Sequence, residues 1–343
     1  MRIGLIARGD NRGLGQQTWA YFRHLDPVKT MLVDCPSAQP LPLHLDRFPG
    51  AAVVHGLPAA KDYRWLCTDV DVVLTAETGY GDLWTEAEKA GTKTVLALNY
   101  EFLNVRDRPT LWAAPSLWHY ENIPNRKCFL PVPIETDRFP IRRWPVYATA
   151  KHFLHVVGRP TWNGRQDLNR NGTRDVIKAL RHVTSEIAVT FRCQVEGYVE
   201  GLLAQHHVPD NVTVTVDAGD HPNYWDAYRD QDCLLIPRRF GGLCLPVNEA
   251  LGAGIPALMT DIPPNNQWLP KTWLSPARYT DSFVAKQRVE CYTVDHEAYA
   301  ASIDRLASSA RAFADARIEA QRLAGELSWG SLRDTYIKTF EEL

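Results

Sequence analysis

Short apolar runs alternate with helical patterns along this chain, and this alternation constrains its fold most. In the first half, the runs have the length and composition of buried strands, and amphipathic stretches lie between them. The expected strands are 3–7, 30–33, 51–54, 70–75, 94–98 and 128–132, and the expected helices are 16–25, 59–67 and 80–90. Strand–helix–strand units of this kind predict a parallel sheet that is covered on both faces.

The same alternation restarts after residues 139–151, a segment with prolines and basic residues that we interpret as a linker. The expected strands of the second half are 152–157, 187–193, 212–216 and 233–236, and the expected helices are 173–181, 199–205, 222–229 and 247–253, followed by a helical tail from residue 296. A chain of 343 residues is long for one core. We therefore expect two doubly wound α/β domains, which bind ligands at the carboxyl ends of their strands.

Composition narrows the functional classes. The net charge of −2 argues against general binding to nucleic acid or to membrane surfaces. No apolar run reaches the ~20 residues of a membrane span, and the first residues do not resemble a signal peptide. Seven cysteines, with no Cys-x-x-Cys pair, favour reduced thiols over disulfides or a zinc site. The expectation is a cytoplasmic protein with no stable membrane span.

Three glycine-bearing turns follow expected strands, and the first is "ARGDNRGLGQQT" (7–18). Gly13 and Gly15 would let backbone amides approach a ligand, and the amino end of the next helix favours an anion. Position 18 is threonine, so the Gly-x-Gly-x-x-Gly spacing of a dinucleotide site is absent. A plain tight turn and a diphosphate-binding loop both remain open here.

The second turn lies in "VVGRPTWNGRQDLNRNGTRDVIKAL" (156–180). Arg159 follows a strand directly, and Arg170 precedes the amino end of a helix. Two guanidinium groups beside a helix amino end can bind a diphosphate, because arginine matches phosphate oxygens in a fork. The alternative is a solvated basic loop.

The third turn is "RRFGGLCLPVNEALGAGIP" (238–256). The backbone amides of Gly242, Leu243 and Cys244 would point toward phosphate oxygens. Glu249, about one turn into the helix, could accept hydrogen bonds from both hydroxyls of a ribose. A glutamate early in a helix is also favourable helix electrostatics, and that alternative stays open on these residues alone.

The segment "GGLCLPVNEALGAGIPALMTD" (241–261) resembles the signature of the retaining, nucleotide-sugar-dependent glycosyltransferases of the GT-B fold, of the family 4-like group. "FLPVPIETDRF" (129–139), "FLHVVGRP" (153–160) and "LSWGSLRDTYIKTF" (327–340) resemble further landmarks of that family in the same order. The resemblance is strong over residues 129–261 and thin before residue 110.

The resemblance implies an α/β GT-B architecture with two Rossmann-like, doubly wound domains that face each other across a cleft. Residues 1–142 would form the acceptor-side domain, 143–326 the nucleotide-sugar domain, and 327–343 a terminal helix that packs back on the first domain. The family's diphosphate ligands fall on Arg159 and on Arg170, where lysine is usual, and its ribose ligand falls on Glu249.

Two positions depart from the family pattern. The family's first glutamate, which faces the donor sugar, falls on Gly241. The histidine that the family carries after a first-domain strand falls on Asn99 or Tyr100. Two explanations compete: the enzyme uses an unusual sugar or acceptor, or the chain has lost activity and is a silent nucleotide-sugar-binding protein.

Three polar residues at expected strand ends could replace the missing groups. Glu77, Glu101 and His55, in that order of preference, are candidates to orient an acceptor hydroxyl or to remove its proton. The alternative for each is a structural polar group at a strand end.

The implied reaction moves a sugar from a nucleoside-diphosphate sugar to an acceptor hydroxyl. Arginines and a helix amino end would stabilise the departing diphosphate, so no metal and no cofactor are expected. The family implies retention, although a true base at Glu77 or Glu101 would allow inversion. The default acceptor is a glycan, lipid or small molecule, and a modified base in DNA is the alternative.

Overall fold

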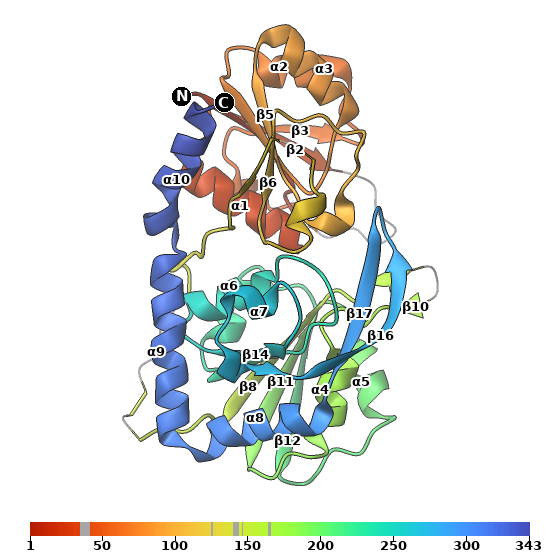
Figure 1. Cartoon of the computed structure of the whole chain (residues 1–343), viewed down its shortest axis with the longest axis vertical. Helices are drawn as coiled ribbons and strands as arrows, with labels where there is room; N and C mark the ends of the chain where they lie inside the picture. Colours follow the sequence, from red (N-terminus) through yellow and green to blue (C-terminus); the bar gives the residue numbers. More distant parts are fainter. Residues whose placement is uncertain (35–41, 125, 140–143, 146, 164–165) are drawn as a thin grey trace. The chain divides into compact units, whose positions relative to one another are not determined.

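The computed structural model describes residues 1–34, 42–124, 126–139, 144–145, 147–163 and 166–343 (Figure 1). The chain divides into two compact units. Unit 1 comprises Met1–Pro133, Ala285–Gln287 and Trp329–Leu343, and unit 2 comprises Ile134–Val284 and Arg288–Ser328. The described cysteines are free. Within the described part of the chain, no helix has the length and apolar character to cross a membrane.

The observed division after Pro133 comes earlier in the chain than the expected boundary after residue 142. Ile134 and Phe139 are buried in the core of unit 2, where the ring of Phe139 packs against that of Tyr228 at 5.5 Å. These apolar contacts assign the segment to unit 2. The expected linker, 139–151, includes residues 140–143 and 146, which lie outside the described residues, and its Ala150 is also part of the unit 2 core.

Unit 1 is built on a parallel sheet of seven described strands in the order β3-β2-β1-β4-β5-β6-β7. The strands are β1 (Ile3–Ala7), β2 (Lys29–Asp34), β3 (Ala52–His55), β4 (Val72–Ala76), β5 (Lys93–Ala97), β6 (Leu111–Ala114) and β7 (Lys127–Phe129). The helices are α1 (Gly13–Leu25), α2 (Ala60–Cys67), α3 (Gly81–Ala90) and α10 (Trp329–Glu341), with short 3-10 helices η1 (Leu45–Arg47), η2 (Tyr100–Phe102) and η3 (Tyr120–Asn122).

Both faces of this sheet are buried, as continuous apolar runs predict. Neighbouring residues of β1 point to opposite faces, so Leu5 joins the core beneath α1 and α10, whereas Ile6 joins the core beneath α2 and α3 (Figure 1). The expected return of the terminal helix to the first domain is confirmed: Tyr336 of α10 packs against Tyr21 of α1 and donates a hydrogen bond to the carbonyl of Pro131.

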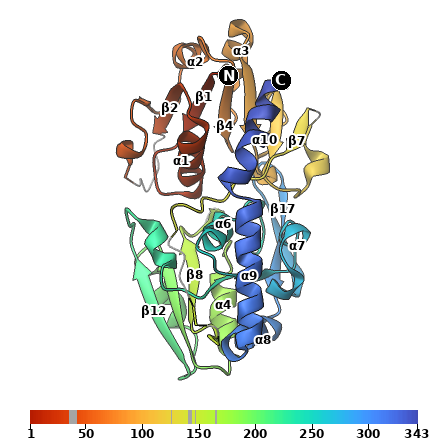
Figure 2. The same ribbon diagram turned by 90° about the vertical axis from the view of Figure 1, so that its left-hand side faces the viewer.

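Unit 2 contains a parallel sheet of six described strands in the order β12-β11-β8-β13-β14-β15. The strands are β8 (His152–Gly158), β11 (Ile187–Cys193), β12 (Val212–Ala218), β13 (Cys233–Ile236), β14 (Ala257–Thr260) and β15 (Leu274–Ser275). The helices are α4 (Thr173–Leu180), α5 (Tyr198–Leu203), α6 (Leu245–Gly252), α7 (Asn265–Trp268), α8 (His296–Ser308) and α9 (Ala310–Glu326), with 3-10 helices η4 (Tyr224–Tyr228) and η5 (Lys271–Trp273). In Figure 2, α9 runs beside α6.

Two antiparallel hairpins complete unit 2, and the sequence reasoning did not predict them. One joins β9 (Trp162–Asn163) to β10 (Gln166–Asp167), and the other joins β16 (Ala277–Val284) to β17 (Arg288–Val294). Strand β6 of unit 1 was also missed, and the expected helix 222–229 is the 3-10 helix η4. The predicted α/β class with two doubly wound domains is otherwise confirmed.

Candidate functional site

The loops after β8 and β13 lie next to each other, because these strands are parallel neighbours in the unit 2 sheet. Arg159 follows β8 directly and is half-buried. Asn171 ties the loop that ends in α4 back to β8, since its Nδ2 donates to the carbonyls of Val156 and Val157 at 3.0 and 3.2 Å. Both strand ends therefore meet at the amino end of α4.

Arg170 is fixed at that same helix end. Its carbonyl accepts a hydrogen bond from the amide of Arg239 at 3.0 Å, and its guanidinium lies over the ring of Phe240 at 5.5 Å. Gly172, the residue that precedes α4, has a left-handed φ of +75°. A Cβ there would lie 2.2 Å from the carbonyl oxygen of Pro237, so only glycine lets the two loops approach this closely.

Gly242, Leu243 and Cys244 occupy the loop that enters α6, as the sequence predicts. Cys244 is the residue before the helix and makes no side-chain cap, and a proline lies in the first turn. A helix that begins this way presents backbone amides rather than a capping side chain. This arrangement suits an anion, although the diphosphate role of these residues stays a prediction.

Glu249 lies in α6 within a cluster of aromatic and charged side chains. The hydroxyl of Tyr228 donates to its Oε2 at 2.5 Å. Burial raises the pKa of Glu249 above its usual range, whereas the hydrogen bond from Tyr228 and the charge of Arg138 lower it. Arg138 pairs with Glu135 and donates to the hydroxyl of Tyr224 at 3.0 Å, so it connects the segment 134–139 to η4.

The segment 218–225, which the resemblance associates with the nucleobase, follows β12. The guanidinium of Arg138 lies 4.8 Å from the ring centre of Trp225, and the ring of Tyr224 meets that of Trp225 edge-on. Nearby Gly219 has φ of +103°, and its carbonyl accepts from the Nη2 of Arg192 at 2.6 Å. Arg138 is thus a neighbour of the aromatic rings in this segment and also acts by its charge on Glu249.

His155 lies in β8 beneath this loop cluster and is fully buried. Its Nδ1 donates to the carbonyl of Leu235 at 2.7 Å, and its Nε2 accepts from the hydroxyl of Thr173 at 2.9 Å. Burial lowers the pKa of His155 to about 4, and Asp175 opposes this only in part. The imidazole is therefore neutral in the folded chain and joins β13 to the first residue of α4.

This burial predicts a loss of stability in mild acid. The unfolded chain takes up a proton at His155 near pH 6.5, whereas the folded chain does so only near pH 4. Above pH 6.5 the neutral His155 costs the folded chain no stability. Below pH 6.5 the free energy of unfolding falls by about 1.4 kcal/mol per pH unit, and the total loss reaches roughly 3 kcal/mol near pH 4. Urea unfolding at pH 7, 6 and 5 measures this slope. In His155→Gln the slope of the unfolding free energy against pH should decrease by the equivalent of one proton. Equal slopes for both proteins would contradict the assignment of this proton to His155.

Gly13 and Gly15, the first predicted turn, lie in unit 1. Gly13 begins α1, and a Cβ at Gly15 would lie 2.0 Å from the carbonyl oxygen of Asp10. Close packing therefore accounts for Gly15 without a ligand. The buried carboxylate of Asp10 lies 3.8 Å from Arg8 and 3.6 Å from Arg12. A diphosphate role for this turn remains a prediction.

Glu77 and Asn99 meet at the carboxyl ends of the neighbouring strands β4 and β5. The Nδ2 of Asn99 donates to Oε1 of Glu77 at 2.7 Å. Glu77 has a φ of +56°, a conformation that a non-glycine residue adopts at an energetic cost and that is concentrated at functional sites. Asn99, which falls in the slot of the family's histidine, is buried and orients the first-choice carboxylate.

The other two candidates lie apart from each other. Glu101 is buried in η2, just after β5, and its carbonyl accepts from the amide of Lys286. His55 is exposed at the end of the edge strand β3, where its Nδ1 lies 3.0 Å from Asp34. Glu77 and Glu101 follow the neighbouring strands β4 and β5, so both lie near the carboxyl ends of these strands. His55 does not lie there, because β2 and β1 separate its strand β3 from β4.

The sequence reasoning missed Asp107 as a member of this region. A Cβ at Gly79 would lie 2.1 Å from Oδ2 of Asp107, and the Nε1 of Trp84 donates to its Oδ1 at 3.3 Å. Burial raises the pKa of Asp107, and the hydrogen bond from Trp84 lowers it. The glycine at position 79 indicates that another group packs closely against the backbone there, but the sequence could not show that this group is the carboxylate of Asp107.

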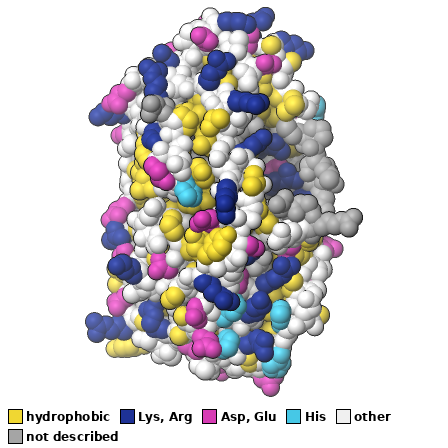
Figure 3. Space-filling model, turned by 45° about the vertical axis from the view of Figure 1, so that its right-hand side comes forward, with side chains coloured by type: hydrophobic (Ala, Val, Ile, Leu, Met, Phe, Trp, Pro, Cys, Tyr) yellow, Lys and Arg dark blue, Asp and Glu magenta, His cyan; other side chains and the backbone are white. Residues whose placement is uncertain are grey.

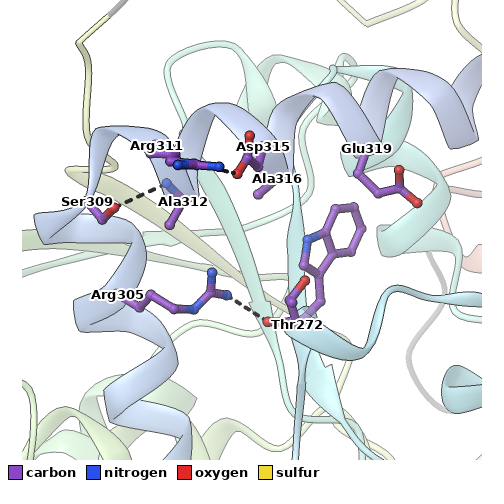
Figure 4. A pocket seen from close by; sticks show the side chains of 9 residues that line it. Thr272, Arg305, Ser309, Arg311, Ala312, Asp315, Ala316 and Glu319 are labelled. Carbon is purple, nitrogen blue, oxygen red and sulfur yellow. Dashed lines mark hydrogen bonds and ion pairs between the residues drawn. The ribbon is translucent and has the colours of Figure 1, made fainter.

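A separate pocket of about 270 Å³ lies against α9 in unit 2 (Figure 4). Its wall carries charges that already interact with protein groups: Arg305 donates to the carbonyl of Thr272, and Arg311 lies 3.8 Å from Asp315. The pocket contains none of the predicted site residues, so we assign it no role.

Comparisons with known proteins establish the fold. No family model and no curated protein matches the sequence. Solved structures match along the whole chain: HepE of Anabaena in complex with UDP-glucose (TM-score 0.69, 10% identity, 100% of both chains), a glycosyltransferase of Rickettsia africae (0.64, 11%, 99% and 98%) and the sucrose-phosphate synthase of Thermosynechococcus elongatus (0.64, 12%, 100% and 98%). Such low identity establishes architecture alone, and the architecture is the GT-B fold that the sequence resemblance predicted.

Proposed function

We propose that this protein is a glycosyltransferase that uses a nucleoside-diphosphate sugar as its donor. The observation that carries the proposal is the convergence, within unit 2, of Arg159, Arg170 and the glycine loop before α6 at the carboxyl ends of β8 and β13. Two guanidinium groups and two helix amino ends suit a diphosphate. The neighbour HepE, solved with UDP-glucose, supports the same ligand class.

In this proposal the chain's own charges stabilise the departing diphosphate. Arg159 and Arg170 bind its oxygens, and Glu249 binds the ribose. Preorganised charges of this kind act at the moment the glycosidic bond breaks. The reaction then needs no metal, and we propose retention of the anomeric configuration. Two Asp-x-Asp pairs occur, but Asp71 and Asp232 lie at the amino ends of β4 and β13, where they accept hydrogen bonds from backbone amides.

The acceptor side of the proposal rests on unit 1. Glu77, held by Asn99, is the group proposed to orient or deprotonate the acceptor hydroxyl. A glycan, lipid or small molecule is the proposed acceptor class. A DNA acceptor gains no support. On the face drawn in Figure 3, the described basic and acidic side chains are interspersed. No neighbour named above is described as acting on DNA.

Thermal unfolding against a panel of nucleotides and nucleotide sugars tests the proposal. Ligand at about 100 times its dissociation constant should add about 2.7 kcal/mol to the stability of the folded chain. Glu249→Gln keeps an acceptor for Tyr228 but loses the second carboxylate oxygen, so we expect a 10- to 100-fold loss of affinity, about 1.5–3 kcal/mol. Glu249→Ala should lose at least as much.

Glu326→Gln, an exposed change on α9, is the matched control and should keep the full stabilisation. A panel in which no nucleotide stabilises the protein would remove the proposed function. With the donor identified, NMR of the product shows whether the anomeric configuration is retained. Binding without hydrolysis or transfer to any acceptor would favour the silent nucleotide-sugar-binding protein instead.

A further inference from the structure

The residue directly before Arg170 has an uncommon backbone conformation. Asn169 has a left-handed φ of +49°, which few residues other than glycine adopt and in which asparagine is enriched. Its amide donates to Oδ1 of Asp167 at 2.9 Å, and its carbonyl accepts from the amide of Gly172 at 2.9 Å. Two hydrogen bonds therefore hold the backbone where the chain enters Arg170.

The side chain of Asn169 is buried and uses both ends of its amide group. Its Nδ2 donates to Oδ2 of Asp175 at 3.1 Å, and its Oδ1 accepts from the backbone amide of Arg174 at 3.1 Å. Arg174 and Asp175 both lie in the first turn of α4. The two bonds therefore attach the loop to the amino end of this helix. An amide side chain can donate and accept at once, whereas a carboxylate can only accept.

The carboxylates that receive these bonds are themselves held in place. Nε2 of His296, the first residue of α8, lies 2.9 Å from Oδ1 of Asp175. Oδ2 of Asp167 accepts from the hydroxyl of Tyr198 at 2.6 Å and lies 3.0 Å from Nη2 of Arg174. Both carboxylates are buried. Neither can turn away from the loop without breaking a second bond in the interior, so the network holds the loop in one conformation.

Arg170 thus lies between two held segments. On its carboxyl side, its carbonyl accepts from the amide of Arg239 at 3.0 Å. On its amino side, the bonds of Asn169 attach the chain to α4 and to two buried carboxylates. This order is established when the chain folds, so the entropy of ordering the loop is not lost again when a ligand binds the guanidinium.

We propose that Asn169 is a positioning residue of the donor site. Through its bonds to Asp175 and to the backbone of α4, it places the guanidinium of Arg170 for the diphosphate before the donor binds. This inference rests on the proposed function, because it takes Arg170 to be a diphosphate ligand. It adds that a buried, uncharged side chain controls how much Arg170 contributes, since small displacements of a binding group are costly.

A double-mutant cycle on nucleotide affinity tests the proposal. Calorimetry measures the dissociation constants of UDP, GDP and ADP at neutral pH for the unchanged protein, Asn169→Gly, Arg170→Ala and the double variant. Glycine at residue 169 keeps the left-handed conformation and removes both side-chain bonds. For the diphosphate that binds, Asn169→Gly should weaken binding about 10-fold in the unchanged background, which is about 1.4 kcal/mol, and by less than about twofold in the Arg170→Ala background.

Asn169→Asp is the second variant, because aspartate has nearly the volume of asparagine and also tolerates the left-handed conformation. It keeps an acceptor for the amide of Arg174 but places a carboxylate opposite that of Asp175, in the place of a donor. It should weaken binding at least as much as Asn169→Gly, and this loss should also disappear in the Arg170→Ala background. Urea unfolding of each variant confirms that the titrated protein is folded.

Asn211→Gly is the matched control in the same unit. Nδ2 of Asn211 donates to the carbonyls of Val183 and Ser185, near the amino ends of β11 and β12. The variant should lower stability but change nucleotide affinity by less than about twofold. Equal losses from Asn169→Gly in both backgrounds, or no loss in either, would overturn this inference and leave the proposed function intact. If none of the three diphosphates binds the unchanged protein, the proposed function itself is overturned.

Discussion

Arg170→Ala should lower kcat/KM for the donor by about 100- to 1,000-fold, the range found when one preorganised charge or donor is removed from a developing anion. Arg170 lies at the amino end of α4, its carbonyl is bonded to Arg239, and its guanidinium is held over Phe240. These contacts fix the group before the donor arrives. The loss should therefore appear in kcat as well as in KM, because the negative charge on the diphosphate grows as the glycosidic bond breaks.

Two further variants make this result specific. Arg170→Lys keeps the charge that is usual at this position in the family, so it should recover much of the activity while losing the fork geometry. Arg181→Ala removes an exposed cation at the other end of α4 and should change kcat/KM by less than threefold. Steady-state kinetics with the donor identified by thermal stabilisation gives all three values. An Arg170→Ala enzyme within threefold of the unchanged protein would show that the diphosphate lies elsewhere.

The sequence predicted the strand framework well where apolar runs are buried on both faces. Expected strands 3–7, 187–193 and 233–236 coincide with β1, β11 and β13. Strand β6, Leu111–Ala114, is as long as β13 but lies between Pro109 and Pro115, and such proline-flanked runs are typical of loops or edge segments, so the run was not identified as a strand. The hairpin β16–β17 was missed because β16 has no buried residue and no apolar run, although in β17 the buried Val289 and Cys291 alternate with exposed residues.

The positions of the proposed donor-site residues were predictable because they lie at the carboxyl ends of strands and match a motif. The burial of Arg238 was not predictable, since the sequence presents Arg238 and Arg239 as equal neighbours. Only the fold shows that the first is buried beside Gly241 and that the second extends to the hairpin. Asp107 was missed for a related reason: its contact with Gly79 joins segments that are distant along the chain.

Gly172→Ala should destabilise unit 2 far more than Gly197→Ala, although the two glycines have the same local role. Both precede a helix, α4 and α5 respectively, with φ values of +75° and +74°. The conformation alone costs alanine about 1 kcal/mol at either position. A Cβ at Gly197 meets nothing within 4 Å, whereas at Gly172 it would lie 2.2 Å from the carbonyl oxygen of Pro237.

A backbone oxygen cannot move aside as a flexible side chain can, so the loop after β13 must shift away from α4. Overpacking of this kind adds roughly 1–3 kcal/mol, and the total for Gly172→Ala should be about 2–4 kcal/mol. Urea unfolding followed by tryptophan fluorescence measures both variants against the unchanged chain. Equal costs at the two positions would contradict the close approach of these loops.

The same shift should reach the donor site, because Pro237 precedes Arg238 and the amide of Arg239 bonds to the carbonyl of Arg170. Moving this loop displaces the backbone of Arg170. Gly172→Ala should therefore also reduce the thermal stabilisation by the nucleotide ligand, measured relative to its own unliganded state, whereas Gly197→Ala should keep it in full. A Gly172→Ala protein that is less stable but stabilised as strongly by the ligand would show that the packing of α4 against the loop supports the fold and not the site.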